Sequence, residues 1–150
     1  MGENCMKNKK FLLIFSIVLV IVIITVVFVN QRETTYGNLL ERNLEGETIS
    51  AISIRHYTQS EDRNMRLNSP EEISKLTSDL SEMELDRTRT AMGRNYIVLF
   101  HTEEGYSFAM SFDDNGVVRI TGENSDFQIQ GENRLLETLN SFEDKWSIVD

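Results

Sequence analysis

Hydrophobic positions follow two different patterns along the chain. From Phe11 to Val29 they form a continuous run without any charged residue, in which only Ser16 and Thr25 are mildly polar. From Thr48 onward they alternate with polar residues, as in half-buried strands, or recur every three or four residues, as in amphipathic helices. The pattern predicts a lipid-soluble segment followed by a folded domain.

The apolar run is long enough to cross a membrane. A helix over residues 11–29 spans roughly 28 Å, which is close to the thickness of the hydrocarbon core of a bilayer. A cleaved signal peptide has a shorter apolar core and ends at small residues, whereas no Ala or Gly occurs between Phe11 and Tyr36. We therefore predict a retained transmembrane helix that contacts the lipid bilayer, with a cleaved signal peptide or a buried core helix as the alternatives.

The charges beside the run predict its orientation. Three lysines precede it within residues 1–10, whereas Arg32 follows it beside Glu33. Basic residues concentrate on the cytoplasmic side of a span. This predicts a single-pass protein of the cell membrane, with a short cytoplasmic tail (1–10) and residues 31–150 extracytoplasmic.

Cysteine content and net charge limit the class of protein. The single cysteine is Cys5, so we expect no disulfide within the domain, and translation starting at Met6 instead of Met1 would remove it. The net charge is −9, and all acidic residues except Glu3 follow the apolar run. An acidic domain repels phosphates, so nucleic acid is excluded as a partner.

After the apolar run, residues 30–47 are predicted to form a juxtamembrane stalk. Leu39, Leu40 and Leu44 recur at helical spacing after Asn38, which is a candidate N-cap, so this stalk contains a candidate short helix.

Residues 48–150 carry the signals of the domain itself. Ser69, Pro70 and Glu72 have the spacing of a capping box with proline at the first helical position. The predicted elements are a strand at 48–58, a polar turn at 59–64, a helix from Ser69 to Met83, strands at 96–102, 106–112, 117–121 and 126–130, and a helix at 132–142. The order β-α-β-β-β-β-α predicts an α+β domain in two layers, with an antiparallel sheet of about five strands and two helices on one face.

Two groups of residues resemble metal sites. The stretch from Phe112 to Gly116, FDDNG, has three oxygen-bearing residues in succession, but consecutive side chains diverge, so a tight hairpin is favoured over a calcium loop. His56 and His101 are candidate ligands of a transition metal, together with Glu103 or Glu104, but their separation matches no motif. The sequence shows no nucleophile motif and no glycine-rich phosphate loop, so we expect neither an enzyme nor a cofactor.

A group of arginines provides the candidate ligand contacts. Arg87, Arg89 and Arg94 lie in one connection of an otherwise acidic domain. Arginine recognises carboxylates and phosphates, so these residues are predicted to contact an anionic ligand, such as a cell-wall polymer or an envelope protein. The alternative is a solvated loop that offsets neighbouring acids.

Four stretches carry a family resemblance: ISAISI (49–54), SPEEISKLTSDLSEMELDR (69–87), NYIVLF (95–100) and FAMSFDDNGVVRI (108–120). Over about residues 48–140 the chain resembles small membrane-anchored extracytoplasmic domains of unknown function from Gram-positive bacteria. The resemblance implies an exported β/α domain and no catalytic residues. We expect a membrane-anchored binding or interaction module, with an immunity or inhibitor protein that blocks a toxin or hydrolase at the cell envelope as the alternative.

Overall fold

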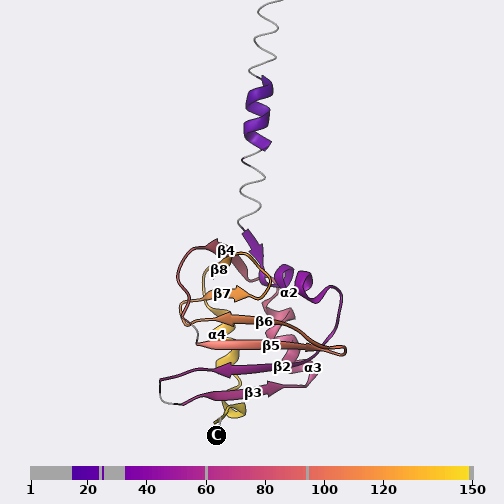
Figure 1. The fold of residues 1–150 in the computed structure, drawn as a ribbon, viewed down its shortest axis with the longest axis vertical. Helices are drawn as coiled ribbons and strands as arrows, with labels where there is room; N and C mark the ends of the chain where they lie inside the picture. Colours follow the sequence, from indigo (N-terminus) through magenta and orange to yellow (C-terminus); the bar gives the residue numbers. More distant parts are fainter. Residues whose placement is uncertain (1–14, 24, 26–32, 60, 94, 149–150) are drawn as a thin grey trace, which may run out of the picture. The chain divides into compact units, whose positions relative to one another are not determined.

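The computed structural model describes residues 15–23, 25, 33–59, 61–93 and 95–148. From residue 33 onward the chain is an α+β fold built on one antiparallel sheet (Figure 1). Its nine strands are β1 (Glu33–Thr35), β2 (Ile49–His56), β3 (Arg63–Leu67), β4 (Glu84–Thr88), β5 (Tyr96–Thr102), β6 (Gly105–Phe112), β7 (Val117–Ile120), β8 (Asp126–Ile129) and β9 (Ser147–Ile148).

The helices of this part of the chain are short and well capped. They are α2 (Tyr36–Leu44), α3 (Pro70–Leu76) and α4 (Arg134–Asn140), with the 3₁₀ turns η1 (Ser78–Leu80) and η2 (Glu143–Lys145). The predicted capping box of α3 is confirmed: the Ser69 hydroxyl accepts a hydrogen bond from the Glu72 amide, and the Glu72 carboxylate accepts one from the Ser69 amide.

The strand order is β1-β4-β8-β7-β6-β5-β2-β3-β9. The predicted meander is confirmed, because β5 to β8 are consecutive neighbours in antiparallel register. Gly116 permits the tight β6–β7 turn with a φ of 77°, a conformation that other residues rarely adopt.

One face of the sheet holds the core. Along β5 and β6 the side chains alternate between buried and half-exposed, because successive residues of a strand point to opposite faces. The buried set includes Tyr96, Val98, Phe100, Phe108, Met110 and Phe112. These residues form one cluster with Leu39 of α2, Leu76 of α3 and Leu135 of α4, so the three helices cover the same face. In Figure 1, α3 and α4 pass behind the strands.

The structure corrects several predicted elements. The polar turn at 59–64 ends in β3, a strand whose short sequence holds only two apolar residues, Met65 and Leu67. The helix predicted to reach Met83 ends at Leu76, after which the chain makes η1 and then β4. With β1 and β9, two very short strands, the sheet has nine strands in place of about five.

The segment predicted as a stalk includes α2, whose Tyr36, Leu39 and Leu40 are buried in the core. Its N-cap is Thr35, whose hydroxyl accepts a hydrogen bond from the Asn38 amide, so Asn38 is not the cap. The compact unit accordingly begins at Thr34.

The N-terminal unit is described only in part. Residues 15–23 and 25 are helical, and the described parts of the chain hold no helix that is long and apolar enough to cross a membrane. Residues 11–14, 24 and 26–29 of the predicted span lie outside the described residues, as do residues 1–10.

Candidate functional site

The helices that contribute to the core all pack on the first face of the sheet. Among the described residues from 33 onward, no helix packs on the second face. Its central row runs across five neighbouring strands. In register order it consists of Asn64, Arg55, Ile97, Ser111 and Arg119. We call this surface the open face.

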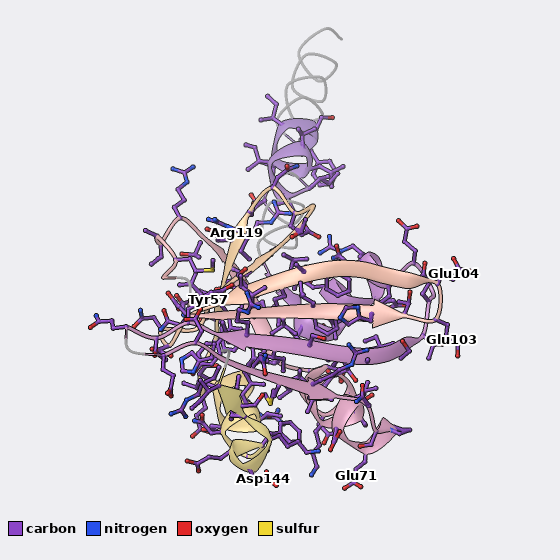
Figure 2. All side chains as sticks on the ribbon, turned by 60° about the horizontal axis from the view of Figure 1, so that its bottom comes forward. Tyr57, Glu71, Glu103, Glu104, Arg119 and Asp144 are labelled. Atoms are coloured by element: carbon purple, nitrogen blue, oxygen red, sulfur yellow. The ribbon has the colours of Figure 1, made fainter. Side chains whose placement is uncertain are left out.

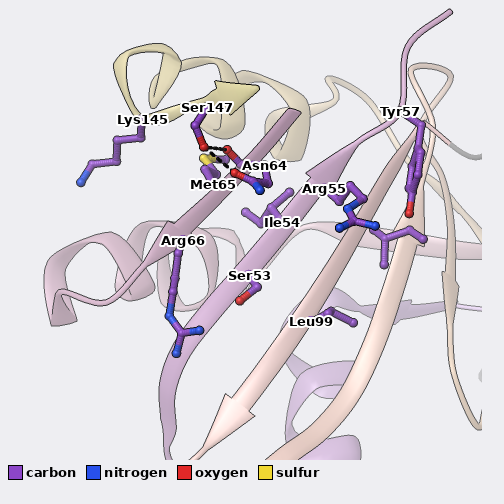
Figure 3. Close-up of a pocket in the computed structure, with 11 residues that line it drawn as sticks. Ser53, Ile54, Arg55, Tyr57, Asn64, Met65, Arg66, Leu99, Lys145 and Ser147 are labelled. Carbon is purple, nitrogen blue, oxygen red and sulfur yellow. Dashed lines mark hydrogen bonds between the residues drawn. The ribbon is translucent and has the colours of Figure 1, made fainter. Parts of the chain in front are cut away.

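A trough of about 610 Å³ crosses the open face over β5, β2 and β3 (Figure 3). Its exposed apolar part is supplied by the half-exposed side chains of Ile97 and Leu99 on β5, whereas Ile54 and Met65, which also line it, are buried. Polar groups from Ser53, Asn64 and Ser147 also line it. The trough therefore combines an apolar strip with hydrogen-bonding groups, the usual composition of a binding site.

The charged groups of the trough are all basic. Arg55, Arg66 and Lys145 line it, and no carboxylate does among the described residues. This is unusual in a chain with 24 acidic and 15 basic residues. A basic trough in an acidic protein attracts anions locally, because nearby charges dominate the potential in a concave site.

Two of these cations have no ion-pair partner among the described residues. Arg55 is exposed, and its guanidinium lies 5.9 Å from the centroid of the Tyr57 ring. The hydrogen bond with Tyr57 raises the pKa of Arg55 above its ordinary value. Arg66 is also exposed, and its Nε donates to the Asn68 side-chain oxygen at 3.0 Å. Both guanidinium groups retain donors for a bound anion.

The C-terminal segment closes one end of the trough. Lys145 forms an ion pair with Glu72 of α3, and the Ser147 hydroxyl donates to the Asn64 carbonyl at 3.2 Å. The hydrogen bond from Lys145, followed by that from the Ser69 backbone, lowers the pKa of Glu72 to about 2. The ion pair holds this segment against α3, and the Lys145 ammonium is already engaged by Glu72.

The arginines predicted as ligand contacts lie elsewhere. Arg87 is exposed on β4, Arg89 is exposed in the connection that follows, and Arg94 lies outside the described residues. Neither Arg87 nor Arg89 lines the trough. Their contact with a ligand stays a prediction.

The two histidines are far apart. His56 pairs in register with Tyr96 on the core face, whereas His101 is on the open face at the other end of β5, with Nε2 3.0 Å from the Ser53 hydroxyl. Five residues of strand separate the two positions by about 17 Å. Glu103 lies at the tip of the β5–β6 hairpin, at the opposite end of the sheet from Tyr57 (Figure 2).

The FDDNG stretch forms the hairpin that the sequence favoured. Asp113 is buried, and its carboxylate accepts hydrogen bonds from the amides of Asn115 and Val117, both at 3.0 Å, and of Gly93 at 2.9 Å. Both carboxylate oxygens of Asp113 are thus bonded to backbone amides. The turn therefore does not present a set of oxygen ligands that converge on a metal ion. Among the described residues no group of three or more metal-binding side chains occurs.

The sequence did not single out Arg55 or Arg66. The alternation in 48–58 places Arg55 opposite Ile54 across the strand, but it carries no sign of which face the helices cover. Arg66 belongs to β3, which the sequence presented as a turn.

Fold and site together define a small α+β domain with one helix-covered face and one open face that carries a trough whose charged lining residues are basic. Comparison of the chain with protein-family models, with curated proteins and with solved structures found no match.

Proposed function

We propose that this protein is an interaction module that binds an anionic partner in the trough on its open face. The observation that carries the proposal is the pair of arginines, Arg55 and Arg66, which have no ion-pair partner among the described residues and line an apolar strip that no described acidic side chain lines, in a strongly acidic chain. Arginine is suited to this role because its planar guanidinium binds a carboxylate with two parallel hydrogen bonds.

The spacing of the arginines favours an extended acidic polypeptide. Arg66 pairs in register with Ser53, two residues from Arg55 on the neighbouring strand. Strand geometry then puts the two Cα atoms about 8 Å apart. Alternate residues of an extended chain are about 7 Å apart, so two acidic side chains at positions i and i+2 match the spacing of the two arginine Cα atoms, and an apolar residue beside them would pack on Ile97 and Leu99.

The apolar N-terminal segment supports placing this module at a cell membrane. The large apolar side chains in helical residues 15–23 are 50% to 60% exposed, as suits a helix surrounded by lipid. The Thr25 hydroxyl donates to the Ile21 carbonyl at 2.8 Å, which satisfies a polar group within the helix itself, as lipid requires. We propose that residues 11–29 anchor the protein with the acidic domain outside; protease added to intact cells should then digest the domain, and its complete protection would refute this orientation.

A peptide-display selection tests the proposed partner. The full chain, solubilised in detergent, is used to select from a random peptide library. We expect enriched peptides to carry acidic residues at i and i+2 beside an apolar residue, and their affinity to fall at least tenfold in the double variant Arg55→Gln/Arg66→Gln, because each lost charged hydrogen bond contributes about 1.5–3 kcal/mol.

The double variant Arg87→Gln/Arg89→Gln is the matched control, since it removes the same charge from exposed arginines outside the trough. Its affinity should stay close to that of the parent. Enrichment of peptides without acidic residues, or an equal loss in the control variant, would contradict the assignment of the trough.

A further inference from the structure

A second concave site lies at one end of the core face, where the sheet meets the C-terminal segment. It is a cleft of about 360 Å³. One wall comes from three residues in register on neighbouring strands: Arg63 on β3, His56 on β2 and Tyr96 on β5. The other wall is Asn140 at the end of α4, Glu143 of η2, and Trp146.

The aromatic rings of the cleft contact one another. The rings of His56 and Tyr96 are stacked with centroids 4.1 Å apart and 11° between their planes, and Tyr96 in turn stacks on Phe112 at 4.6 Å. Trp146 stands against this stack, with its ring 5.8 Å from His56 and tilted by 58°. His56 and Phe112 cover the two faces of the Tyr96 ring, so the aromatic surface that a ligand can reach comes from the half-exposed side chains of His56 and Trp146.

The residues on both sides of Trp146 hold it in position. Lys145 is paired with Glu72 of α3, and Ser147 bonds to Asn64 of β3. The tryptophan wall is thus fixed before any ligand arrives, which lowers the entropy lost on binding.

The polar groups of the cleft are balanced in charge. Arg63 brings a positive charge and hydrogen-bond donors, Glu143 a negative charge and acceptors, and Asn140 a neutral amide that does both. Burial lowers the pKa of His56, so its imidazole is neutral at pH 7. This separates the cleft from the trough on the open face, whose charged groups are all basic.

These features argue against two common classes of ligand. A flat heteroaromatic ligand that is sandwiched between two parallel rings needs those two rings to be separated by about twice the usual stacking distance. His56 and Trp146 do not provide such a gap, because their rings are 5.8 Å apart and tilted. His56 and Tyr96 are already in contact with each other. A strong anion is disfavoured because Glu143 faces the same cleft as Arg63.

We infer that the cleft of His56, Arg63, Tyr96, Asn140, Glu143 and Trp146 binds a neutral sugar residue. The C–H face of a pyranose ring packs on an aromatic side chain, and its hydroxyl groups both donate and accept hydrogen bonds, which the amide, carboxylate and guanidinium match. A single ring or the end of a glycan chain fits the volume of the cleft. The site shares no lining residue with the proposed peptide trough.

The position of the tryptophan makes the inference directly measurable. Trp146 is the only tryptophan of the chain, so its fluorescence reports on this cleft. The full chain is solubilised in a detergent without a sugar headgroup and titrated with the neutral trisaccharides of N-acetylglucosamine, glucose (β-1,4-linked) and mannose. We expect at least one of them to change the emission with a saturable curve, and expect the anionic trimer of galacturonic acid and the planar nucleoside adenosine to bind at least tenfold more weakly.

Exposed residues of the cleft provide the variants. Asn140→Ala and Glu143→Ala should each weaken the response at least tenfold without changing the thermal unfolding midpoint, because both side chains are exposed. Asp144→Ala is the matched control: it removes an exposed acid of the same 3₁₀ turn that does not line the cleft, and its affinity should equal that of the parent.

Three results would overturn the inference: no saturable change with any of the neutral trisaccharides, equal binding of adenosine or the anionic trimer, or equal loss in Asp144→Ala. The double variant Arg55→Gln/Arg66→Gln should bind the sugar as the parent does, so failure of the peptide trough and failure of the sugar cleft are observed separately.

Discussion

The buried carboxylate of Asp113 is the strongest single test of how this fold is held together. Its side chain is 1% exposed and accepts hydrogen bonds from three backbone amides, two within the β6–β7 turn and one from Gly93 in the connection between β4 and β5. Asp113 therefore stabilises a hairpin and also attaches a long connection to it. Loss of the carboxylate leaves amides at a site that water reaches poorly.

The expected magnitudes follow from those three bonds. An amide-to-carboxylate hydrogen bond contributes about 1.5–3 kcal/mol. In Asp113→Asn the remaining oxygen serves the amides of Asn115 and Val117, while the new amide nitrogen faces the Gly93 donor, so we expect a loss of about 2 kcal/mol. Asp113→Ala removes all three bonds, and we expect about 4 kcal/mol, a large part of the 5–15 kcal/mol that stabilises a typical domain.

Urea unfolding followed by far-ultraviolet circular dichroism measures these losses. The control is Asp114→Asn, the exposed neighbour whose carboxylate accepts one bond from the Asn95 side chain at 2.5 Å; we expect it to lose less than about 1 kcal/mol. Hydrogen exchange adds a local readout, because the Val117 amide should exchange faster in Asp113→Ala. The role of the buried carboxylate would be refuted if Asp113→Asn were as stable as the parent. It would also be refuted if Asp114→Asn lost as much stability as Asp113→Asn.

Two further predictions concern buried polar groups. The Tyr36 hydroxyl is fully buried without a hydrogen-bond partner among the described residues, so Tyr36→Phe should raise the free energy of unfolding by about 1–2 kcal/mol; a lower urea midpoint would show that the hydroxyl is bonded. Burial lowers the pKa of His56 below its unfolded value of about 6.5. The unfolded chain therefore binds the proton more readily than the folded chain does. The free energy of unfolding should be highest above that pH and decrease as the pH falls below it. His56→Phe should weaken this dependence between pH 7.5 and 5.5 in urea titrations, and an unchanged slope would contradict it.

Local signals in the sequence predicted those elements whose stability is local. The Ser69–Glu72 capping box depends on residues three apart, and the β6–β7 hairpin depends on Gly116, so both were readable from the chain. The strict alternation in β5 and β6 was readable for the same reason. β3 and β4 were missed because their short sequences carry few apolar residues and they become strands only through pairing with β2 and β8.

The candidate sites depended on long-range packing. Arg87 and Arg89 stand out in the sequence because they are close together in it, whereas Arg55 and Arg66 meet only because β2 and β3 pair in one particular register. Likewise Trp146 reaches His56 only through the return of the C-terminal segment, which the Lys145–Glu72 ion pair and the short strand β9 hold in place.

The sequence by itself determined an apolar N-terminal segment, an acidic α+β domain, an antiparallel meander, and the caps and turns that depend on neighbouring residues. Which face of the sheet the helices cover was decided only by the tertiary structure, because an alternating strand specifies two faces and not what packs on either. That choice buries Tyr96 and Phe112, leaves Arg55 and Ile97 on the open face, and brings the C-terminal tryptophan to the end of the core.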